Sequence, residues 1–162
     1  MRLDYRGFSL VELLIVVAVI LIIVGIAIPN FLRSRVAANQ ASAIESLRVI
    51  GTAEASYAST YGTGYSVSLS CLGPPLPGQN ANSTAAGLLD DLLAAGGKSG
   101  YSFLYTPGQY NAALQSWNAY TLQANPTVFG TTGGVYYYTD QSFVIRANTT
   151  APASSSDTAV AD

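Results

Sequence analysis

The chain has 162 residues, a formal net charge of −2, only 10% charged residues, one cysteine and no histidine. Without a basic cluster, direct nucleic-acid binding through phosphates is not expected. With Cys71 as the lone cysteine, the chain cannot form an internal disulfide, a His/Cys metal site or a Cys/His catalytic pair. The length allows one helical anchor and one small domain. We therefore expect no enzyme activity, catalytic residue, metal or cofactor.

A short charged leader, residues 1–7, precedes an apolar stretch that runs to Leu32. Residues 13–32 carry no charge, and at about 1.5 Å rise they cover about 30 Å, the thickness of a bilayer core. A secretory signal has a shorter apolar region and a small-residue cleavage site directly after it. The stretch therefore predicts a membrane helix over residues 8–32, with an ordinary signal peptide or plain anchor as the alternative.

Glu12 is the one ionisable residue within residues 8–32. A charge at membrane depth costs roughly 2.5–3.5 kcal/mol on insertion scales, so it indicates a function and needs a partner. Neither a signal peptide nor a plain anchor has a use for this carboxylate.

The string RGFSLVELLI at positions 6–15 resembles the class III signal sequence of type IV prepilins and pseudopilins. The resemblance implies a cytoplasmic leader that a membrane prepilin peptidase cleaves between Gly7 and Phe8. It also implies that the same peptidase methylates the new amino group of Phe8.

Glu12 lies one helical turn from Phe8, whose amino group would be mostly cationic near neutral pH after cleavage. In a filament, the carboxylate of one subunit could pair with the Phe8 ammonium of a neighbour. A buried charge is tolerated when it is paired, so this pair would set the axial register of the subunits. Pairing of Glu12 with its own N-terminus is the alternative.

Residues 33–61 continue the helix, with apolar side chains at spacings of three, four and seven that predict an amphipathic segment. Pro29 removes a backbone donor and should kink or break the helix, and Gly25 is a further weak point. Two outcomes are open: a rigid kink, or local melting of residues 25–29 that lets a filament stretch.

Residues 62–147 predict a loop, a short helix and a small antiparallel sheet. Residues 70–83 are rich in Pro, Gly and Asn and indicate a loop, and leucines within residues 85–95 predict a short helix capped by Ser83 or Thr84. The predicted strands are residues 101–105, 117–124, 135–138 and 143–147, with a hairpin turn at 140–142. A sheet of this kind would cover the apolar stripe of the long helix, which predicts an α+β fold.

Three smaller features complete the pattern. Residues 148–162 contain few apolar side chains and predict a flexible tail. Cys71 is expected to be a buried apolar residue, with a disulfide between subunits as the alternative. Asp140 has no second acidic residue nearby in the sequence, which favours a turn residue over a calcium ligand.

The sequence therefore predicts a structural subunit of a type IV pilus, assembled through its N-terminal helix after leader cleavage. The resemblance implies four partners: other pilin subunits, the prepilin peptidase, the membrane before assembly, and the inner-membrane assembly machinery. It also implies a single-pass inner-membrane protein that later enters an extracellular pilus. The alternative is a periplasmic pseudopilin of a type II secretion system. A membrane-tethered enzyme is disfavoured, because the chain lacks histidine and a convergent acidic cluster.

Overall fold

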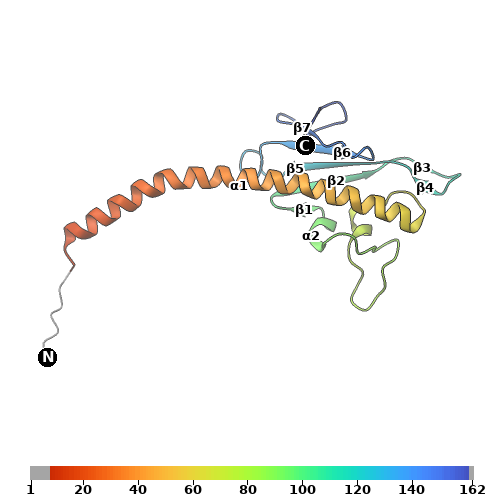
Figure 1. The fold of residues 1–162 in the computed structure, drawn as a ribbon, viewed down its shortest axis with the longest axis horizontal. Coiled ribbons are helices and arrows are strands. Elements are labelled where there is room, and N and C mark those ends of the chain that lie inside the picture. Colours follow the sequence, from red (N-terminus) through yellow and green to blue (C-terminus); the bar gives the residue numbers. More distant parts are fainter. Residues whose placement is uncertain (1–7, 161–162) are drawn as a thin grey trace. The chain divides into compact units, whose positions relative to one another are not determined.

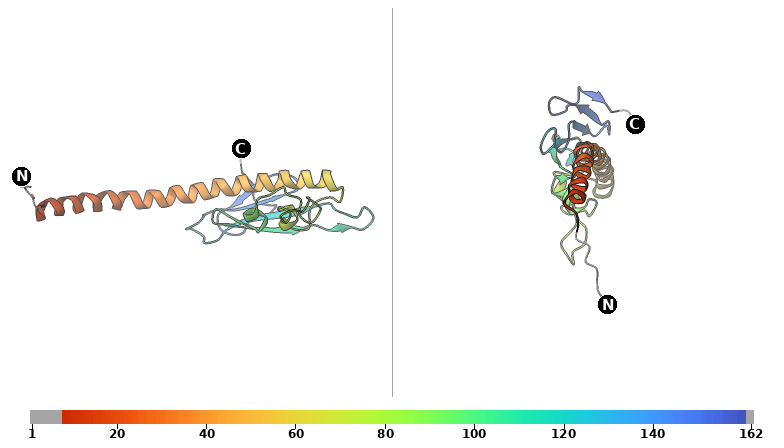
Figure 2. Two further views of the ribbon diagram at one scale, coloured as in Figure 1. Left: turned by 90° about the horizontal axis from the view of Figure 1, so that it is seen from below. Right: turned by 90° about the vertical axis from the view of Figure 1, so that its left-hand side faces the viewer.

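A computed structural model describes residues 8–160 of the chain (Figures 1 and 2). The chain divides into two compact units, Met1–Arg35 and Val36–Asp162. Helix α1, Leu10–Tyr61, begins in the first unit and ends in the second. The predicted leader, residues 1–7, lies outside the described residues.

The first unit is the N-terminal part of α1. It is helical without interruption through Gly25 and Pro29, and every side chain from Phe8 to Arg35 is exposed. Among the described residues, α1 is the one helix that is long and apolar enough, by length and composition, to cross a bilayer. The prediction of a helix break at Gly25 and Pro29 is therefore wrong for this chain, because the hydrogen bonds of the flanking turns maintain the helix around the missing Pro29 donor. A kink, or local melting of residues 25–29 in a filament, stays a prediction.

The second unit contains a six-stranded antiparallel sheet with the strand order β1-β2-β5-β6-β7-β8. Its strands are β1 (Gly97–Lys98), β2 (Tyr101–Pro107), β5 (Tyr120–Pro126), β6 (Tyr136–Asp140), β7 (Arg146–Asn148) and β8 (Thr158–Ala159). A separate two-stranded ribbon consists of β3 (Tyr110–Asn111) and β4 (Ser116–Trp117). The β2–β5 pair is the longest and aligns Phe103 with Ala124.

The core of the second unit lies between the sheet and the C-terminal half of α1, which runs along one face of the sheet (Figure 2, left). Alternate residues of β5 are buried, as expected for a strand with one face against a helix. The core residues from these elements are Ala43, Leu47, Ile50, Ala53 and Tyr57 of α1, and Tyr101, Phe103, Tyr120, Leu122, Ala124 and Tyr137 of the sheet. This arrangement confirms the predicted α+β fold.

Two predicted strands have different bounds in the structure. The segment 117–124 is divided between β4 and β5, because residues 118–119 leave the ladder. The segment 143–147 contributes only its last two residues to β7, because Phe143 has a φ of 62°. A bulky residue in this left-handed region cannot continue a strand.

The prediction of a helix over residues 85–95 is wrong for most of that range. The observed helix α2 is only Asp91–Ala94, and its cap is Asp90 rather than Ser83 or Thr84. The backbone N–H groups of Ala86, Leu88 and Leu89 instead donate to carbonyl groups of Cys71 and Leu72, at the end of the 3₁₀-helix η1 (Leu69–Leu72). These long-range bonds hold the segment in an irregular, bent form, in which Gly87 has a φ of 69°.

The prediction of a flexible tail is wrong for residues 148–160, while residues 161–162 lie outside the described residues. Strand β8 pairs with β7, and Ala153 is fully buried. The Asp157 carboxylate accepts hydrogen bonds from the Ser154 backbone N–H at 2.7 Å and from Asn148 Nδ2 at 2.8 Å. Hydrogen bonds between side chains and the loop backbone thus order this segment, although it contains few apolar residues.

Candidate processing and assembly site

The first turn of α1 is closed by a reciprocal pair of hydrogen bonds. The Ser9 backbone N–H donates to Glu12 Oε2 at 2.9 Å, and the Val11 N–H donates to Ser9 Oγ at 3.3 Å. The Ser9 carbonyl also accepts the first helical bond, from Leu13 N–H. Ser9 is therefore the N-cap and Glu12 the third helical residue, whose side chain bonds back to the cap as in a capping box, while Ser9 Oγ accepts from the second helical residue, Val11.

This capping role of Glu12 was missed in the interpretation of the sequence. The signal was present, because Ser-x-x-Glu ahead of an apolar run is the pattern that predicts a capping box. The bond gives Glu12 a local partner in the single chain, at the residue that follows Phe8. The positive end of the helix dipole also favours a carboxylate in this turn.

The capping bond does not exhaust the acceptors of Glu12. It engages Oε2, whereas a carboxylate offers two oxygens and about four acceptor positions. Both Glu12 and Phe8 are exposed, and Phe8 retains 78% of its accessible surface. The carboxylate can therefore cap its own helix and accept a bond from another chain. Gly7, the other residue of the predicted cleavage site, lies outside the described residues.

Gly25 makes no close contact within the chain. A Cβ built on Gly25 would meet no heavy atom within 4 Å, so no packing contact of the single chain requires glycine there. Pro29, four residues later, lies inside the helix. Any requirement for these two residues must come from an environment outside the chain.

The second unit contains a buried carboxylate, Glu54, that was not singled out from the sequence. It is fully buried on α1, where Oε2 accepts from the Ser66 N–H at 2.9 Å and Oε1 accepts from Ser66 Oγ at 2.5 Å. Burial raises the pKa of Glu54 above its usual value, and the Ser66 bonds oppose this effect. The position was detectable, because Glu54 falls between Ile50 and Tyr57 at helical spacing on the apolar stripe.

The Glu54 contacts extend to the sheet through a tyrosine. Tyr105 Oη donates to the Ser66 carbonyl at 2.8 Å, and the Tyr105 ring stacks on Tyr120 at a centroid distance of 5.6 Å. Ser66 therefore connects the C-terminal part of α1 to strand β2. This cluster is a structural connection inside the domain.

Two further predictions about single residues are confirmed. Cys71 is buried, and its Sγ lies 3.4 Å from Ser68 Oγ. Asp140 is a turn residue, since its Oδ1 accepts from the Ser142 N–H at 2.8 Å. Within residues 8–160, no group of three or more His, Cys, Asp or Glu residues is placed to hold a metal ion.

Comparison with known proteins finds similarity in the N-terminal segment. Residues 2–28 match the family described as the prokaryotic N-terminal methylation motif. Over 52 residues the chain is 46% identical to the type IV major pilin protein PilA of Myxococcus xanthus (strain DK1622), an alignment that covers 32% of this chain and 24% of the relative. The match thus spans about a quarter of that relative's length. No solved structure matches the chain.

A methylation motif, a membrane-length apolar helix and an antiparallel sheet packed on the C-terminal part of that helix give the chain a pilin-like α+β fold. Over these matched segments the chain is similar to type IV pilins. The relative that matches over 52 residues is a type IV major pilin.

Proposed function

We propose that this protein is a subunit of a type IV pilus filament, rather than of a type II secretion pseudopilus. The observation that carries assembly through the N-terminal helix, a step common to both filaments, is the first unit, a helix whose side chains are all exposed although most are apolar. Such a surface requires lipid or other helices around it. The name of the Myxococcus relative supports the pilus over the pseudopilus.

Maturation begins at the N-terminus of this helix. A prepilin peptidase hydrolyses the bond between Gly7 and Phe8 and then methylates the Phe8 amino group. The family match over residues 2–28 and the exposure of Phe8 support this step. Before cleavage the protein is a single-pass protein of the inner membrane, and after assembly it is extracellular.

Assembly then transfers the helix from lipid to a bundle of neighbouring helices. In that bundle, the Glu12 carboxylate of one subunit pairs with the Phe8 ammonium of the next, while it continues to cap its own helix. The second acceptor oxygen of Glu12 supports this dual role. Because an unpaired buried charge is costly, the pair selects one axial register.

The processing step is tested by mass spectrometry of the N-terminus in cells with and without the prepilin peptidase. We expect a methylated Phe8 terminus in the first strain and a retained leader in the second. A wild-type protein that keeps residues 1–7 would contradict membership of the processed class.

The choice between pilus and pseudopilus is tested separately. Filaments sheared from the cell surface are imaged, and their subunits are identified by mass spectrometry. We expect this chain as a component of surface fibres. Its absence from surface fibres, together with recovery from the periplasm, would favour the pseudopilin.

A further inference from the structure

A long loop of the second unit, residues 73–85, follows the 3₁₀-helix η1 and extends away from the sheet, as the yellow-green segment of Figure 1 shows. Every residue from Leu76 to Thr84 is exposed. Loops of this kind, on the surface and outside the regular elements, are the segments of a domain that are open to other macromolecules. Side chains on this loop are therefore accessible to an enzyme as well as to water.

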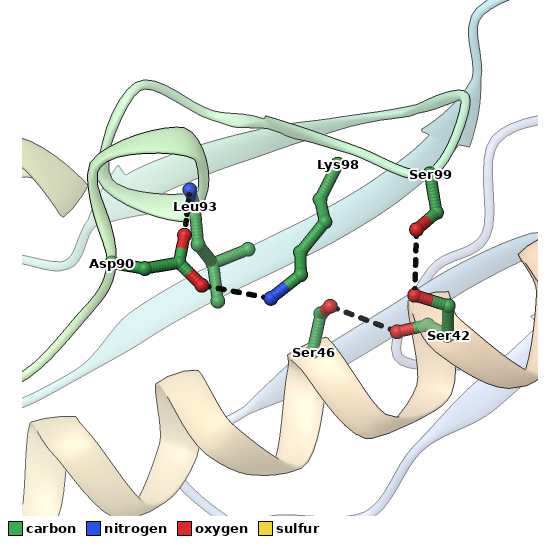
Figure 3. Close-up of polar contacts among 6 residues, drawn as sticks. All are labelled: Ser42, Ser46, Asp90, Leu93, Lys98 and Ser99. Atoms are coloured by element: carbon green, nitrogen blue, oxygen red, sulfur yellow. Dashed lines mark hydrogen bonds and ion pairs between the residues drawn. The ribbon is translucent and has the colours of Figure 1, made fainter.

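The base of this loop is held in place by hydrogen bonds. The Ala86 N–H donates to the Cys71 carbonyl at 2.8 Å, on the other side of the loop. Just beyond it, the Asp90 carboxylate accepts from the Leu93 N–H at 2.7 Å and from Lys98 Nζ at 2.8 Å (Figure 3). The loop thus projects from an ordered base.

The returning limb of the loop contains a tight turn with the sequence Asn82-Ser83-Thr84. Asn82 and Ala85 close this turn by two backbone hydrogen bonds, at 3.1 and 3.0 Å. Tyr57 Oη on α1 donates to the Ser83 carbonyl at 2.7 Å and fixes the turn to the domain. All three residues of the tripeptide are exposed. The tripeptide has the pattern Asn-x-Ser/Thr, which accepts N-linked glycans in exported proteins.

The side chain of Asn82 is arranged for reaction at its nitrogen. Its Oδ1 accepts from the Thr84 N–H at 2.9 Å and from Thr84 Oγ1 at 2.7 Å. These donors stabilise the negative charge that Oδ1 acquires when the amide nitrogen gives up a proton. Within the described residues, Nδ2 makes one contact of 3.4 Å, to the Asn80 carbonyl, which is longer than an ordinary hydrogen bond. The nitrogen is therefore weakly held and exposed.

The same pattern occurs at residues 148–150 in a different environment. Asn148 Oδ1 accepts from the Thr150 N–H at 2.9 Å and from Thr150 Oγ1 at 3.0 Å, as in the first tripeptide. Its Nδ2, however, donates to Asp157 Oδ1 at 2.8 Å, a bond that the carboxylate charge strengthens. Asn148 is also half-buried and belongs to strand β7. The two asparagines share a local geometry, and Asn82 is the one of the pair that presents its nitrogen.

A glycan on Asn82 also fits the surrounding structure. It would replace one hydrogen of Nδ2 and disturb no contact shorter than the one to Asn80. The bonds that Oδ1 accepts would remain, and so would the Tyr57 bond to the turn. At Asn148 the same addition would place a sugar on the nitrogen that bonds Asp157.

We propose that Asn82 is the attachment site of an N-linked glycan. The donor is a lipid-linked oligosaccharide diphosphate, and an oligosaccharide transferase brings it to the exposed loop. Asn82 Nδ2 forms a bond to C1 of the first sugar, while the bond from C1 to the diphosphate oxygen breaks and its electron pair leaves with the lipid diphosphate. The proton of Nδ2 passes to a base of the transferase. The proposal rests on the proposed function in one respect, that the second unit is exported across the inner membrane.

The test is mass spectrometry of the full-length protein purified from the cells that make it, with electron-transfer fragmentation to assign each added mass to one residue. We expect an added mass of one or more sugar residues on Asn82, and several-fold lower occupancy of Asn148. Asn82→Gln and Thr84→Ala should abolish the added mass, and Thr84→Ser should retain it. Ser83→Pro interrupts the pattern without changing either end of it and should also abolish the added mass. Asn148→Gln is the matched control and should leave it unchanged.

The N-terminal peptide in the same spectra separates this proposal from the proposed function. An unmodified Asn82 in a protein with a methylated Phe8 would overturn the glycan and leave the processing standing. An unmodified Asn82 in a protein that keeps its leader would overturn both. Sugar on Ser83 or Thr84 instead would overturn the N-linkage. Equal occupancy of Asn82 and Asn148 would overturn the selection of Asn82 by its exposed nitrogen.

Discussion

Glu54 and Ser66 are joined by two hydrogen bonds that use both oxygens of a fully buried carboxylate. The bonds connect α1 to the loop that follows it, over twelve residues of sequence. Glu54 accepts from both donors of Ser66, its N–H and its hydroxyl. The stability of the second unit should therefore depend on this pair.

Replacement of Glu54 by leucine should destabilise the domain. The change leaves the buried Ser66 N–H without its acceptor, which costs about 1–3 kcal/mol. Glu54→Gln keeps an acceptor for that N–H and should cost less. Unfolding of the full chain in detergent, followed by circular dichroism, measures the difference.

Glu45→Leu is the matched control, because Glu45 is on the same helix with an exposed side chain. We expect its effect to stay within about 0.5 kcal/mol. Equal stability of the Glu54→Leu and Glu45→Leu proteins would contradict a structural role for the buried carboxylate.

The free energy of unfolding should depend on pH through the titration of Glu54. Its pKa is raised in the folded state, mainly by desolvation, so the folded protein holds this proton more tightly than the unfolded chain. The resulting stabilisation is complete below the unfolded pKa of 4.5 and is lost as the pH rises through the higher folded value.

The difference in unfolding free energy between wild type and Glu54→Gln isolates this effect. The pKa values of Asp90 and Asp157 are lowered and give the opposite trend, but they titrate in both proteins and cancel. We expect the wild type to lose stability relative to the variant as the pH increases. A difference that is constant with pH would show that the burial of Glu54 does not perturb its proton affinity.

Glu12→Gln separates the two roles of Glu12. Glutamine at the third helical position maintains a capping box, but it cannot form an ion pair with the Phe8 ammonium of a neighbour. If the ion pair sets the register, Glu12→Gln should reduce filament yield as severely as Glu12→Ala. Loss of a buried pair costs about 3–5 kcal/mol, which corresponds to more than tenfold in assembly.

Filaments are counted by electron microscopy, and mass spectrometry of Phe8 verifies that processing is unchanged. Glu45→Gln provides the control for a neutralised glutamate outside the site. Wild-type filament yield from Glu12→Gln would leave Glu12 with the capping role alone.

Pro29→Ala should stiffen the filament. Alanine restores the missing backbone donor and improves the local helix propensity by about 3 kcal/mol, which opposes melting of residues 25–29. Single fibres pulled in an optical trap should extend less at a given force than wild-type fibres. Unchanged extensibility would favour a rigid kink over local melting.

Gly25→Ala should affect assembly without affecting the single chain. The added methyl group meets no atom within 4 Å in the chain, so the unfolding free energy should stay within about 0.5 kcal/mol of wild type. A decrease in filament yield would then locate a close contact between helices at Gly25. Normal yield would show that glycine is not needed there for packing.

Most of the first unit could be predicted from the sequence, because its properties are local. The length and composition of residues 8–32 predict a helix long and apolar enough to cross a bilayer, without reference to any other part of the chain. The helix cap at Ser9 and Glu12 is equally local, because the pattern Ser-x-x-Glu ahead of an apolar run predicts it. Prediction was weaker where a segment's form depends on a distant partner, as for residues 85–90, which bond to η1 instead of forming a helix.

The sequence by itself determined the anchor, its processing motif and the α+β class, since hydropathy, helical period and strand alternation are all short-range patterns. Only the tertiary structure decided that Glu54 is buried against Ser66, that residues 158–159 add a strand to the sheet, and that the loop between β5 and β6 is bonded to Asn39. Each of these depends on hydrogen bonds between residues that are not neighbours in the sequence. Those distant partners decide whether a carboxylate can be buried or a loop ordered. The periodicity of the sequence does not show which residues will be the partners.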